Sequence, residues 1–366
     1  MSKPWTPVLK AAGDSASVVI PPVTHPFIPR ATFAVPDNIT RSYYLGHHAA
    51  GLRQIATGLT NSGLVLECRD FRVPLTSWNP LLERTLAGPR RIVVYTKADM
   101  GTNAPDARRA LKEMHRSRPG ESAVFVEKGK KQGELLREIR AAAREIDSLT
   151  GVRTFVVGMP NVGKSTLLNT LRNQGMRSSA KVARTSDHPG VTRKLGTPVR
   201  ILGGKDDPDQ SLGEGVFVID TPGIFVPFVP DGESMLKLAL VHGIKDNIVQ
   251  QEVVVDYLLY KLNQWDPSLY AKFCNPTNDV SEFLRAVAKR TGKLEKSRAG
   301  FSLQAASWII AQWRHGYLGR YILDDVNAET IAEKQAELST ERLSMNQARK
   351  REKAARKQRQ EEKRKG

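Results

Sequence analysis

Short apolar runs alternate with helix-spaced apolar positions through the first two thirds of the chain. Runs typical of buried strands occupy residues 64–68, 91–95, 122–126, 152–157 and 216–219. Apolar positions at helical spacing predict helices over residues 47–60, 106–115, 134–149 and 164–172. Strands that alternate with helices predict an α/β fold, in which a mainly parallel sheet is covered on both faces.

Beyond residue 230 only the helical spacing continues. Apolar stripes recur around residues 253–262, 283–288 and 307–313, and they predict an all-α helical bundle over residues 231–325. From about residue 330 the apolar content falls and charge takes over. Residues 326–366 are therefore predicted to form a charged basic tail.

The amino-terminal residues 1–40 have a different composition. They are rich in Pro, Ser, Thr and Ala, and their Lys and Arg residues outnumber the acids. This composition fits an organelle-targeting segment. It fits an extended disordered arm nearly as well, because the prolines prevent a long amphipathic helix.

Charge points to the class of partner. The formal net charge is +18, which is typical of proteins that bind a polyanion, nucleic acid first. Residues 341–366 carry eleven Lys and Arg against four Glu. The basic run from Arg349 to Lys365 contains no aromatic residue, so we expect it to contact phosphate backbones rather than read bases. A solvated basic surface is the alternative reading of both observations.

Cysteine content and hydropathy narrow the class further. The two cysteines, Cys68 and Cys274, lie far apart and match no metal-ligand spacing, which indicates a reducing compartment and no disulfide framework. No apolar run approaches the roughly 20 residues of a transmembrane helix.

The predicted strand over residues 152–157 leads directly into Gly158-Met-Pro-Asn161-Val-Gly163-Lys164-Ser165, and a helix follows. This is the context of a phosphate-binding loop, whose backbone N–H groups and helix N-terminus bind phosphates. We expect Lys164 to reach the β- and γ-phosphates and Ser165 to bind Mg²⁺. The loop residues expected to bind the nucleotide are Asn161, Val162, Gly163, Lys164, Ser165 and Thr166.

Two further segments suit the phosphate end of a nucleotide. Asp220-Thr221-Pro222-Gly223 follows an apolar strand, so Asp220 is expected to hold Mg²⁺ through water and the Gly223 N–H to meet the γ-phosphate. Thr192, in the sequence Pro-Gly-Val-Thr-Arg, is spaced to complete the Mg²⁺ shell and thereby act in catalysis beside Lys164. An ordinary loop residue is the alternative for Thr192.

A base-reading motif, Thr96-Lys97-Ala98-Asp99, follows another predicted strand. Asp99 can accept two hydrogen bonds from guanine N1 and N2, a pair that adenine cannot supply. Lys97 can lie along the base, and Thr96 stands where Asn is usual, which weakens one packing hydrogen bond. A second base-contacting loop is expected after Val126, but Glu-Lys-Gly stands where a Ser-Ala pair is expected, so its position stays open.

These motifs come in rotated order, with the base-reading motif before the phosphate-binding loop. That order resembles the circularly permuted ribosome-assembly GTPases, which include the bacterial ribosome biogenesis GTPase A. Over roughly residues 40–320 the resemblance also rests on the segments Tyr44-Leu45-Gly46-His47-His48, Glu67-x-Arg69-Asp70-x-Arg72-Val73-Pro74 and Asn79-Pro80-Leu81. The form of residues 42–48 looks most like the fungal mitochondrial members.

The resemblance implies a circularly permuted P-loop GTPase domain over residues 41–230, followed by a helical domain that docks on rRNA. It implies hydrolysis of GTP to GDP and phosphate while the protein binds a large ribosomal subunit precursor and promotes its maturation. We expect a monomer in the mitochondrial matrix or at the matrix face of the inner membrane, where peripheral association stays open; a bacterial-type cytoplasm is the alternative.

Catalysis must do without the usual glutamine, because Ile224 follows the Asp-x-x-Gly motif and an aliphatic side chain cannot orient water. The resemblance makes His47 the candidate for that role, with a structural role in capping the following helix as the alternative; His48 is the weaker candidate. Asn161 resembles a ligand for K⁺, which would add positive charge, and stabilisation of the loop is the alternative.

Ile224 also favours a second class of function, a GTP-dependent binding module or translation regulator with little intrinsic hydrolysis. A translation or tRNA-modification GTPase is disfavoured, because the remaining sequence contains no recognisable methylase, metal or aminoacyl-tRNA domain.

Overall fold

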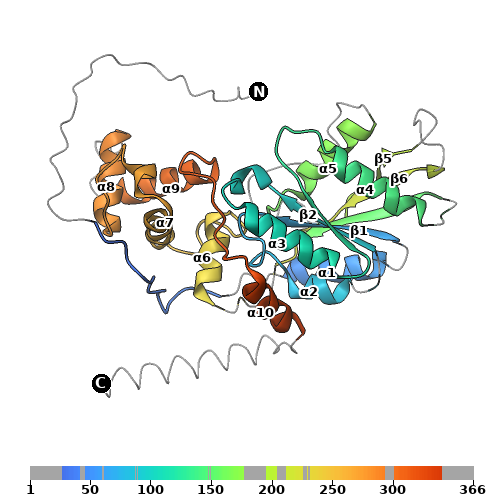
Figure 1. Cartoon of the computed structure of the whole chain (residues 1–366), viewed down its shortest axis with the longest axis horizontal. Coiled ribbons are helices and arrows are strands. Elements are labelled where there is room, and N and C mark those ends of the chain that lie inside the picture. Colours follow the sequence, from blue (N-terminus) through green and yellow to red (C-terminus); the bar gives the residue numbers. More distant parts are fainter. Residues whose placement is uncertain are drawn as a thin grey trace, which may run out of the picture.

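In the part of the chain that the structure describes, a six-stranded sheet forms one end and a group of helices forms the other (Figure 1). The computed structural model describes residues 27–41, 46–59, 62–86, 88, 90–146, 148, 150–176, 195–203, 212–225, 229, 231–292 and 301–339. The predicted contacts of Thr192 and of residues 341–366 lie outside these ranges.

The strands are β1 (Leu64–Asp70), β2 (Arg90–Thr96), β3 (Glu121–Phe125), β4 (Val152–Gly158), β5 (Val199–Leu202) and β6 (Val216–Asp220). Their spatial order is β3-β2-β1-β4-β6-β5. All neighbouring pairs are parallel except β5 with β6. The predicted mainly parallel sheet is therefore confirmed, and β5 adds an antiparallel edge that the sequence pattern did not indicate.

Helices cover both faces of this sheet, as predicted. One face, which includes Val65 and Val93, packs against α1 (Gly46–Leu59), α2 (Pro80–Thr85) and α3 (Pro105–Arg116). The opposite face, which includes Leu66 and Val94, packs against α4 (Gly133–Arg144) and α5 (Lys164–Gly175). Alternate residues of a strand point to opposite faces, so one apolar run supplies both layers.

The other helices are α6 (Gly232–Leu240), α7 (Gln251–Trp265), α8 (Val280–Arg290), α9 (Phe301–Arg314) and α10 (Ala328–Ser339), with short 3₁₀ turns η1 (Ala98–Gly101) and η3 (Pro267–Tyr270). The predicted apolar stripes are buried between α7, α8 and α9, with Leu258, Phe283 and Ile309 at the centre. No helix of the described residues is long and apolar enough to cross a membrane.

Two elements extend beyond what the sequence pattern predicted. Helix α10 lies inside residues 326–366, where we expected a tail, and its Ile331 and Leu338 join the core cluster around Tyr95. Residues 27–40, inside the expected arm, run along the helical group: Arg30 pairs with Asp256 at 2.7 Å, and Phe33 packs edge-on against Tyr257.

Candidate nucleotide-binding site

Three loops predicted to bind nucleotide leave the same edge of the sheet. They follow β2, β4 and β6, which are parallel members of the order β2-β1-β4-β6. The carboxyl ends of parallel strands meet at one edge, and this edge is where α/β sheets bind ligands. The fold therefore brings together motifs that are far apart in the sequence.

The phosphate-binding loop begins at Gly158, where the backbone has a φ of 146°. A Cβ there would lie 2.3 Å from the Cys68 carbonyl oxygen, so only glycine lets the loop start this close to β1. At its other end the Lys164 ammonium is buried and donates to Met159 O at 2.8 Å. Burial lowers the Lys164 pKa, although the carboxylate of Asp220 opposes that shift.

Ser165 and Asp220 meet beside this loop. The Ser165 hydroxyl donates to Asp220 Oδ2 at 2.5 Å, while Asp220 Oδ1 is buried with no hydrogen-bond partner among the described residues. Burial raises the Asp220 pKa, and the bond from Ser165 and the charge of Lys164 oppose that shift. A buried carboxylate oxygen that lacks a partner suits a cation or its bound water. Hydroxyl and carboxylate oxygens are also the ligands that Mg²⁺ prefers.

Thr96 and Lys97 attach the base-reading motif to the phosphate-binding loop. Thr96 Oγ1 donates to Val162 O at 2.5 Å, so the threonine makes a direct hydrogen bond at the position where Asn is usual. Lys97 Nζ lies 2.8 Å from Asn161 O and 2.8 Å from Asp70 Oδ2. Burial lowers the Lys97 pKa, and the carboxylate of Asp70 opposes that shift.

Asp99 contacts the loop that follows β3. Its Oδ1 accepts a hydrogen bond from the Lys128 backbone N–H at 3.1 Å, and Ala98 N donates to Val126 O at 3.0 Å. The loop after β3 is therefore adjacent to Asp99. The sequence left the position of this loop open, because its residues do not match the expected pair.

The Asp220-Thr-Pro-Gly segment is held by α1. His48 is buried, and its Nδ1 lies 2.8 Å from Gly223 O. His47 lies in the first turn of α1, and its side chain is outside the described part of the structure. A Cβ at Gly223 would lie 2.7 Å from Pro160 Cα, which explains the glycine. The sequence favoured His47 over its neighbour, whereas His48 is the residue whose contact with this segment is described.

Sequence reasoning assigned no role to Asp70 and Arg72, although both belong to a quoted motif. Arg72 makes two bonds to Asp70, at 3.0 and 2.7 Å, and also donates to Val241 O at 3.2 Å. The cations Arg72 and Lys97 hold the Asp70 pKa well below its usual range, although burial alone would raise it. Asn161 Nδ2 donates to His242 O at 2.9 Å, so the nucleotide loops touch the turn that follows α6.

Comparison with known proteins gives a consistent set of relatives. Residues 153–289 match the model of the 50S ribosome-binding GTPase family. The chain is 36% identical over 310 residues to mitochondrial GTPase 1 of Schizosaccharomyces japonicus, covering 79% of this chain and 91% of that protein. It is 37% identical over 326 residues to mitochondrial GTPase 1 of Schizosaccharomyces pombe, covering 83% and 95%. Mitochondrial ribosome-associated GTPase 1 of Xenopus tropicalis is 28% identical over 316 residues, covering 81% and 98%.

Proposed function

The chain belongs to the mitochondrial GTPase 1 family of ribosome-binding GTPases, and from this membership we propose that it hydrolyses GTP while bound to a precursor of the mitochondrial large ribosomal subunit, whose maturation it promotes. Family membership implies GTP hydrolysis. The subunit partner and the role in maturation go beyond what family membership implies, and they are part of the proposal.

One observation carries the proposal: three loops that read different parts of a guanine nucleotide are bonded to one another. Thr96 and Lys97 of the base-reading motif bond to Val162 O and Asn161 O of the phosphate-binding loop. Ser165 of that loop bonds to Asp220. These bonds fix the distance between the carboxylate that would read guanine and the loop that would hold the phosphates, which supports a preorganised GTP site.

The domain is a circularly permuted P-loop GTPase over residues 41–230. Its base-reading strand β2 precedes its phosphate-loop strand β4 along the chain, and both run parallel to β1 between them. A binding edge depends on which strands are neighbours in space and not on where the chain begins. Rotating the order therefore keeps the site while moving the ends of the chain.

Ser165, Thr192 and, through water, Asp220 are the proposed ligands of Mg²⁺, and the paired Ser165 hydroxyl and Asp220 carboxylate support the assignment. Bound Mg²⁺ would neutralise charge that develops on the β- and γ-phosphates. Lys164 supplies a second positive charge there, and Asp99 and Lys97 hold the base. Val162, Gly163, Thr166 and Gly223 complete the proposed GTP contacts.

Asn161 is the proposed K⁺ ligand, and its positive φ of 56° supports a specialised position in the loop. Equal hydrolysis rates in K⁺ and Na⁺ at one ionic strength would exclude this role. His47 is the proposed group that orients the attacking water, because Ile224 is buried and carries no polar atom in its side chain. His47→Ala should lower the subunit-stimulated rate and leave GTP affinity nearly unchanged; a large loss of affinity would favour the structural role.

The helical domain over residues 231–325 is proposed to dock on rRNA, and the basic tail within residues 326–366 to add contacts with phosphates. The net charge of +18 supports a polyanionic partner. A monomer in the mitochondrial matrix, or at the matrix face of the inner membrane, is the proposed form, with residues 1–40 as arm or targeting segment. The word mitochondrial in the names of several relatives supports this location.

Co-sedimentation with purified mitochondrial large subunits tests the proposal. The protein should sediment with the subunits more strongly with a nonhydrolysable GTP analogue than with GDP. Equal sedimentation with both nucleotides would contradict a GTP-timed association. The buried Ile224 supports a second candidate function, a GTP-dependent binding module or translation regulator with little hydrolysis. Single-turnover hydrolysis that stays negligible even in the presence of subunits would favour this second function.

A further inference from the structure

The carbonyl groups of Gly223, which ends the Asp220 motif, and of Ile224, which follows it, are held by side chains from two different helices. His48 of α1 lies with Nδ1 2.8 Å from Gly223 O, and Asn79, at the start of α2, donates from Nδ2 to Ile224 O at 2.7 Å. Both side chains are buried. The proposed hydrolysis assigns no role to either contact.

The geometry fixes how the peptide units are oriented. His48 Nδ1 also lies 3.4 Å from Phe225 N, but its shorter contact with a carbonyl oxygen requires a proton on Nδ1. Both side chains therefore donate to carbonyl groups. The Ile224 N–H donates to Gly158 O of the phosphate-binding loop at 3.1 Å. The segment is thus tied to α1, to α2 and to the loop, within three residues of chain.

The Ile224 side chain adds a further anchor. It is fully buried in the cluster that α1 and α2 form with Ile55 and Leu82. A Cβ at Gly51 of α1 would lie 3.0 Å from Ile224 Cδ1, so the helix passes close by. The position that usually carries a glutamine instead fills the space between two helices.

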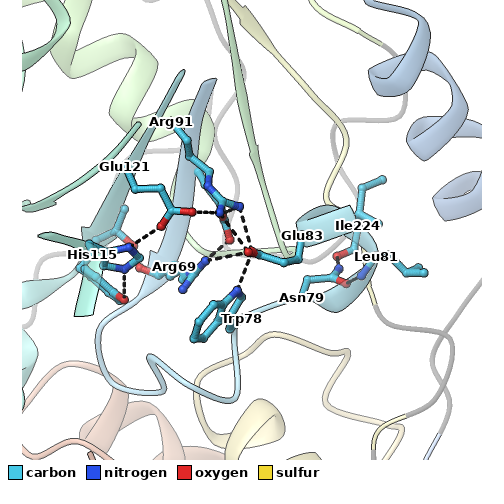
Figure 2. A network of polar contacts seen from close by, with 12 residues as sticks. Arg69, Trp78, Asn79, Leu81, Glu83, Arg91, His115, Glu121 and Ile224 are labelled. Atoms are coloured by element: carbon cyan, nitrogen blue, oxygen red, sulfur yellow. Dashed lines mark hydrogen bonds and ion pairs between the residues drawn. The ribbon is translucent and has the colours of Figure 1, made fainter. Parts of the chain in front are cut away.

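Helix α2 is itself anchored to the strand that carries the base-reading motif, as Figure 2 shows. Its Glu83 accepts two hydrogen bonds from Arg91 of β2, at 2.8 and 3.0 Å, and one from Trp78 Nε1 at 2.8 Å. Asn79 stands one turn before Glu83, and its Oδ1 caps the helix by accepting from Leu81 N at 3.0 Å. Buried ionic bonds are directional, so they set the position of Asn79 closely.

We propose that Asn79 is a positioning residue for GTP recognition: its amide holds the Ile224 carbonyl so that the Gly223 N–H faces the γ-phosphate, and this hold lets the site distinguish GTP from GDP. The proposal rests on the proposed GTP binding. A donor aimed at a ligand contributes most when the protein fixes it in advance. Loosening Ile224 therefore weakens only the contact that GTP has and GDP lacks.

Two substitutions at one position separate this role from helix capping. Asn79→Asp keeps an oxygen that can cap α2, but it places a carboxylate without a donor against Ile224 O. Asn79→Ala loses both contacts. As a matched control, Asp279→Ala removes a similar cap from α8, where Asp279 accepts from Ser281 N at 2.7 Å far from the site.

Titration with guanylyl imidodiphosphate and with GDP gives the first readout. Asn79→Asp should bind the GTP analogue about tenfold more weakly and GDP almost as well as wild type, and its melting temperature should fall because the new carboxylate is buried against a carbonyl oxygen. Asn79→Ala should show the same selective loss together with a lower melting temperature. Asp279→Ala should lower only the melting temperature. Wild-type selectivity in Asn79→Asp would overturn the proposal and leave Asn79 a helix cap.

Amide hydrogen exchange in the nucleotide-free protein gives a readout that does not depend on the proposed function. The peptide covering residues 221–225 should exchange faster in Asn79→Asp than in wild type, while the β4 peptide stays unchanged. Unchanged exchange in residues 221–225 would overturn the positioning role. A wild-type protein that binds neither nucleotide would overturn the proposed function. Amide hydrogen exchange would still test whether Asn79 restrains Ile224.

Discussion

The two faces of the sheet are both buried, but they are held in different ways. The face toward α4 and α5 is apolar, with Leu66 and Val156 packed in one cluster with Ile139 and Leu168. The face toward α2 and α3 carries buried charges: Glu67, Arg69 and Arg91 are each at most 6% exposed. Apolar packing has no preferred direction, whereas each buried charge requires a partner at a particular place.

The charged face is a continuous set of bonds (Figure 2). His115 Nε2 lies 3.0 Å from the Tyr95 hydroxyl, and its Nδ1 lies 2.8 Å from Glu121 Oε2. Burial lowers the pKa of His115. Arg69 donates to Glu67 at 2.7 Å and stacks over Trp78 at 4.3 Å.

This difference matches what each face supports. The apolar face packs against α5, and the first turn of α5 is placed by the glycine-rich loop that directly precedes it. The charged face includes residues of β2, the strand that leads to the base-reading motif. It also bonds to α2, whose N-cap residue Asn79 holds the Ile224 carbonyl group. Directional bonds are therefore concentrated where two parts of the site must keep a fixed separation. The comparison teaches that the charged face specifies position, while the apolar face supplies cohesion.

The largest expected effect is the loss of Arg91, which bonds to Glu67, Glu83 and Glu121. Arg91→Met removes the cation that bonds to all three of these buried carboxylates, so we expect a loss of about 3–5 kcal/mol in the free energy of unfolding. Ile139→Val on the apolar face should cost about 1 kcal/mol. Urea unfolding of both variants checks this, and similar losses would remove the distinction between the faces.

A second substitution separates nucleotide choice from stability. Asp99 is half-buried and lies outside the charged network, next to Lys128. Asp99→Asn should weaken GTP binding about 100-fold, because two hydrogen bonds to a charged acceptor are lost. The variant should gain affinity for xanthosine triphosphate, because the extra carbonyl group of xanthine accepts a hydrogen bond from the amide. Nucleotide titration measures both affinities. GTP binding at the wild-type level would refute the base-site assignment, and unfolding should stay close to wild type as the control.

Acid should unfold the protein through the charged face. Burial alone would raise the pKa of Glu121, but bonds from His115 and Arg91 outweigh it and hold that pKa at about 2. The group therefore contributes stability above its unfolded pKa of roughly 4.3 and loses it as pH falls toward 2. The lowered pKa of His115 acts in the same direction below about pH 6.5, where the unfolded chain takes up a proton.

Glu121→Gln should lower the free energy of unfolding by about 2 kcal/mol at neutral pH. Between pH 5 and about pH 2 the variant should then lose about 2 kcal/mol less of that free energy than the wild type does. Thermal unfolding at a series of pH values measures this slope. Glu113→Gln, at an exposed carboxylate on α3, is the control and should keep the wild-type slope. A slope equal in both variants would mean that the ionic network does not set the acid stability.

The sequence predicted the apolar face better than the charged one. Buried runs mark β1, β2, β4 and β6, and a glycine-rich motif between a strand and a helix identifies the phosphate-binding loop. Helix α2 is too short for a periodic pattern, and α10 buries only Ile331 and Leu338, which are separated by charged residues. Predicted helix 134–149 ends earlier, at Arg144.

Partners of buried charges could not be predicted, because each pair joins different elements. Glu67 lies in the middle of β1 and Arg91 near the start of β2, and only the pairing of the two strands brings them together. His48 and Gly223 are 175 positions apart, and no local pattern connects them. The candidate site was predictable where a short motif carries the chemistry, and not where a long-range contact positions that motif.

The smallest expected effect uses two buried threonines, one in the site and one on the apolar face. Thr96 Oγ1 donates to Val162 O at 2.5 Å, whereas Thr154 Oγ1, on β4, has no hydrogen-bond partner among the described residues. Valine has nearly the same shape but no hydroxyl. Thr96→Val should therefore leave a carbonyl without its donor and cost about 1 kcal/mol, with roughly fivefold weaker nucleotide binding.

Thr154→Val should instead be neutral or stabilising, because it removes a buried polar group that gains no bond from folding. Urea unfolding and GDP titration of the two variants compare the same chemical change in two settings. If both variants shifted stability in the same direction and by the same amount, the hydroxyl of Thr96 would contribute packing alone. Opposite signs would mean that the Thr96 hydroxyl contributes a directed bond between the base-reading motif and the phosphate-binding loop, in the place where the usual asparagine is missing.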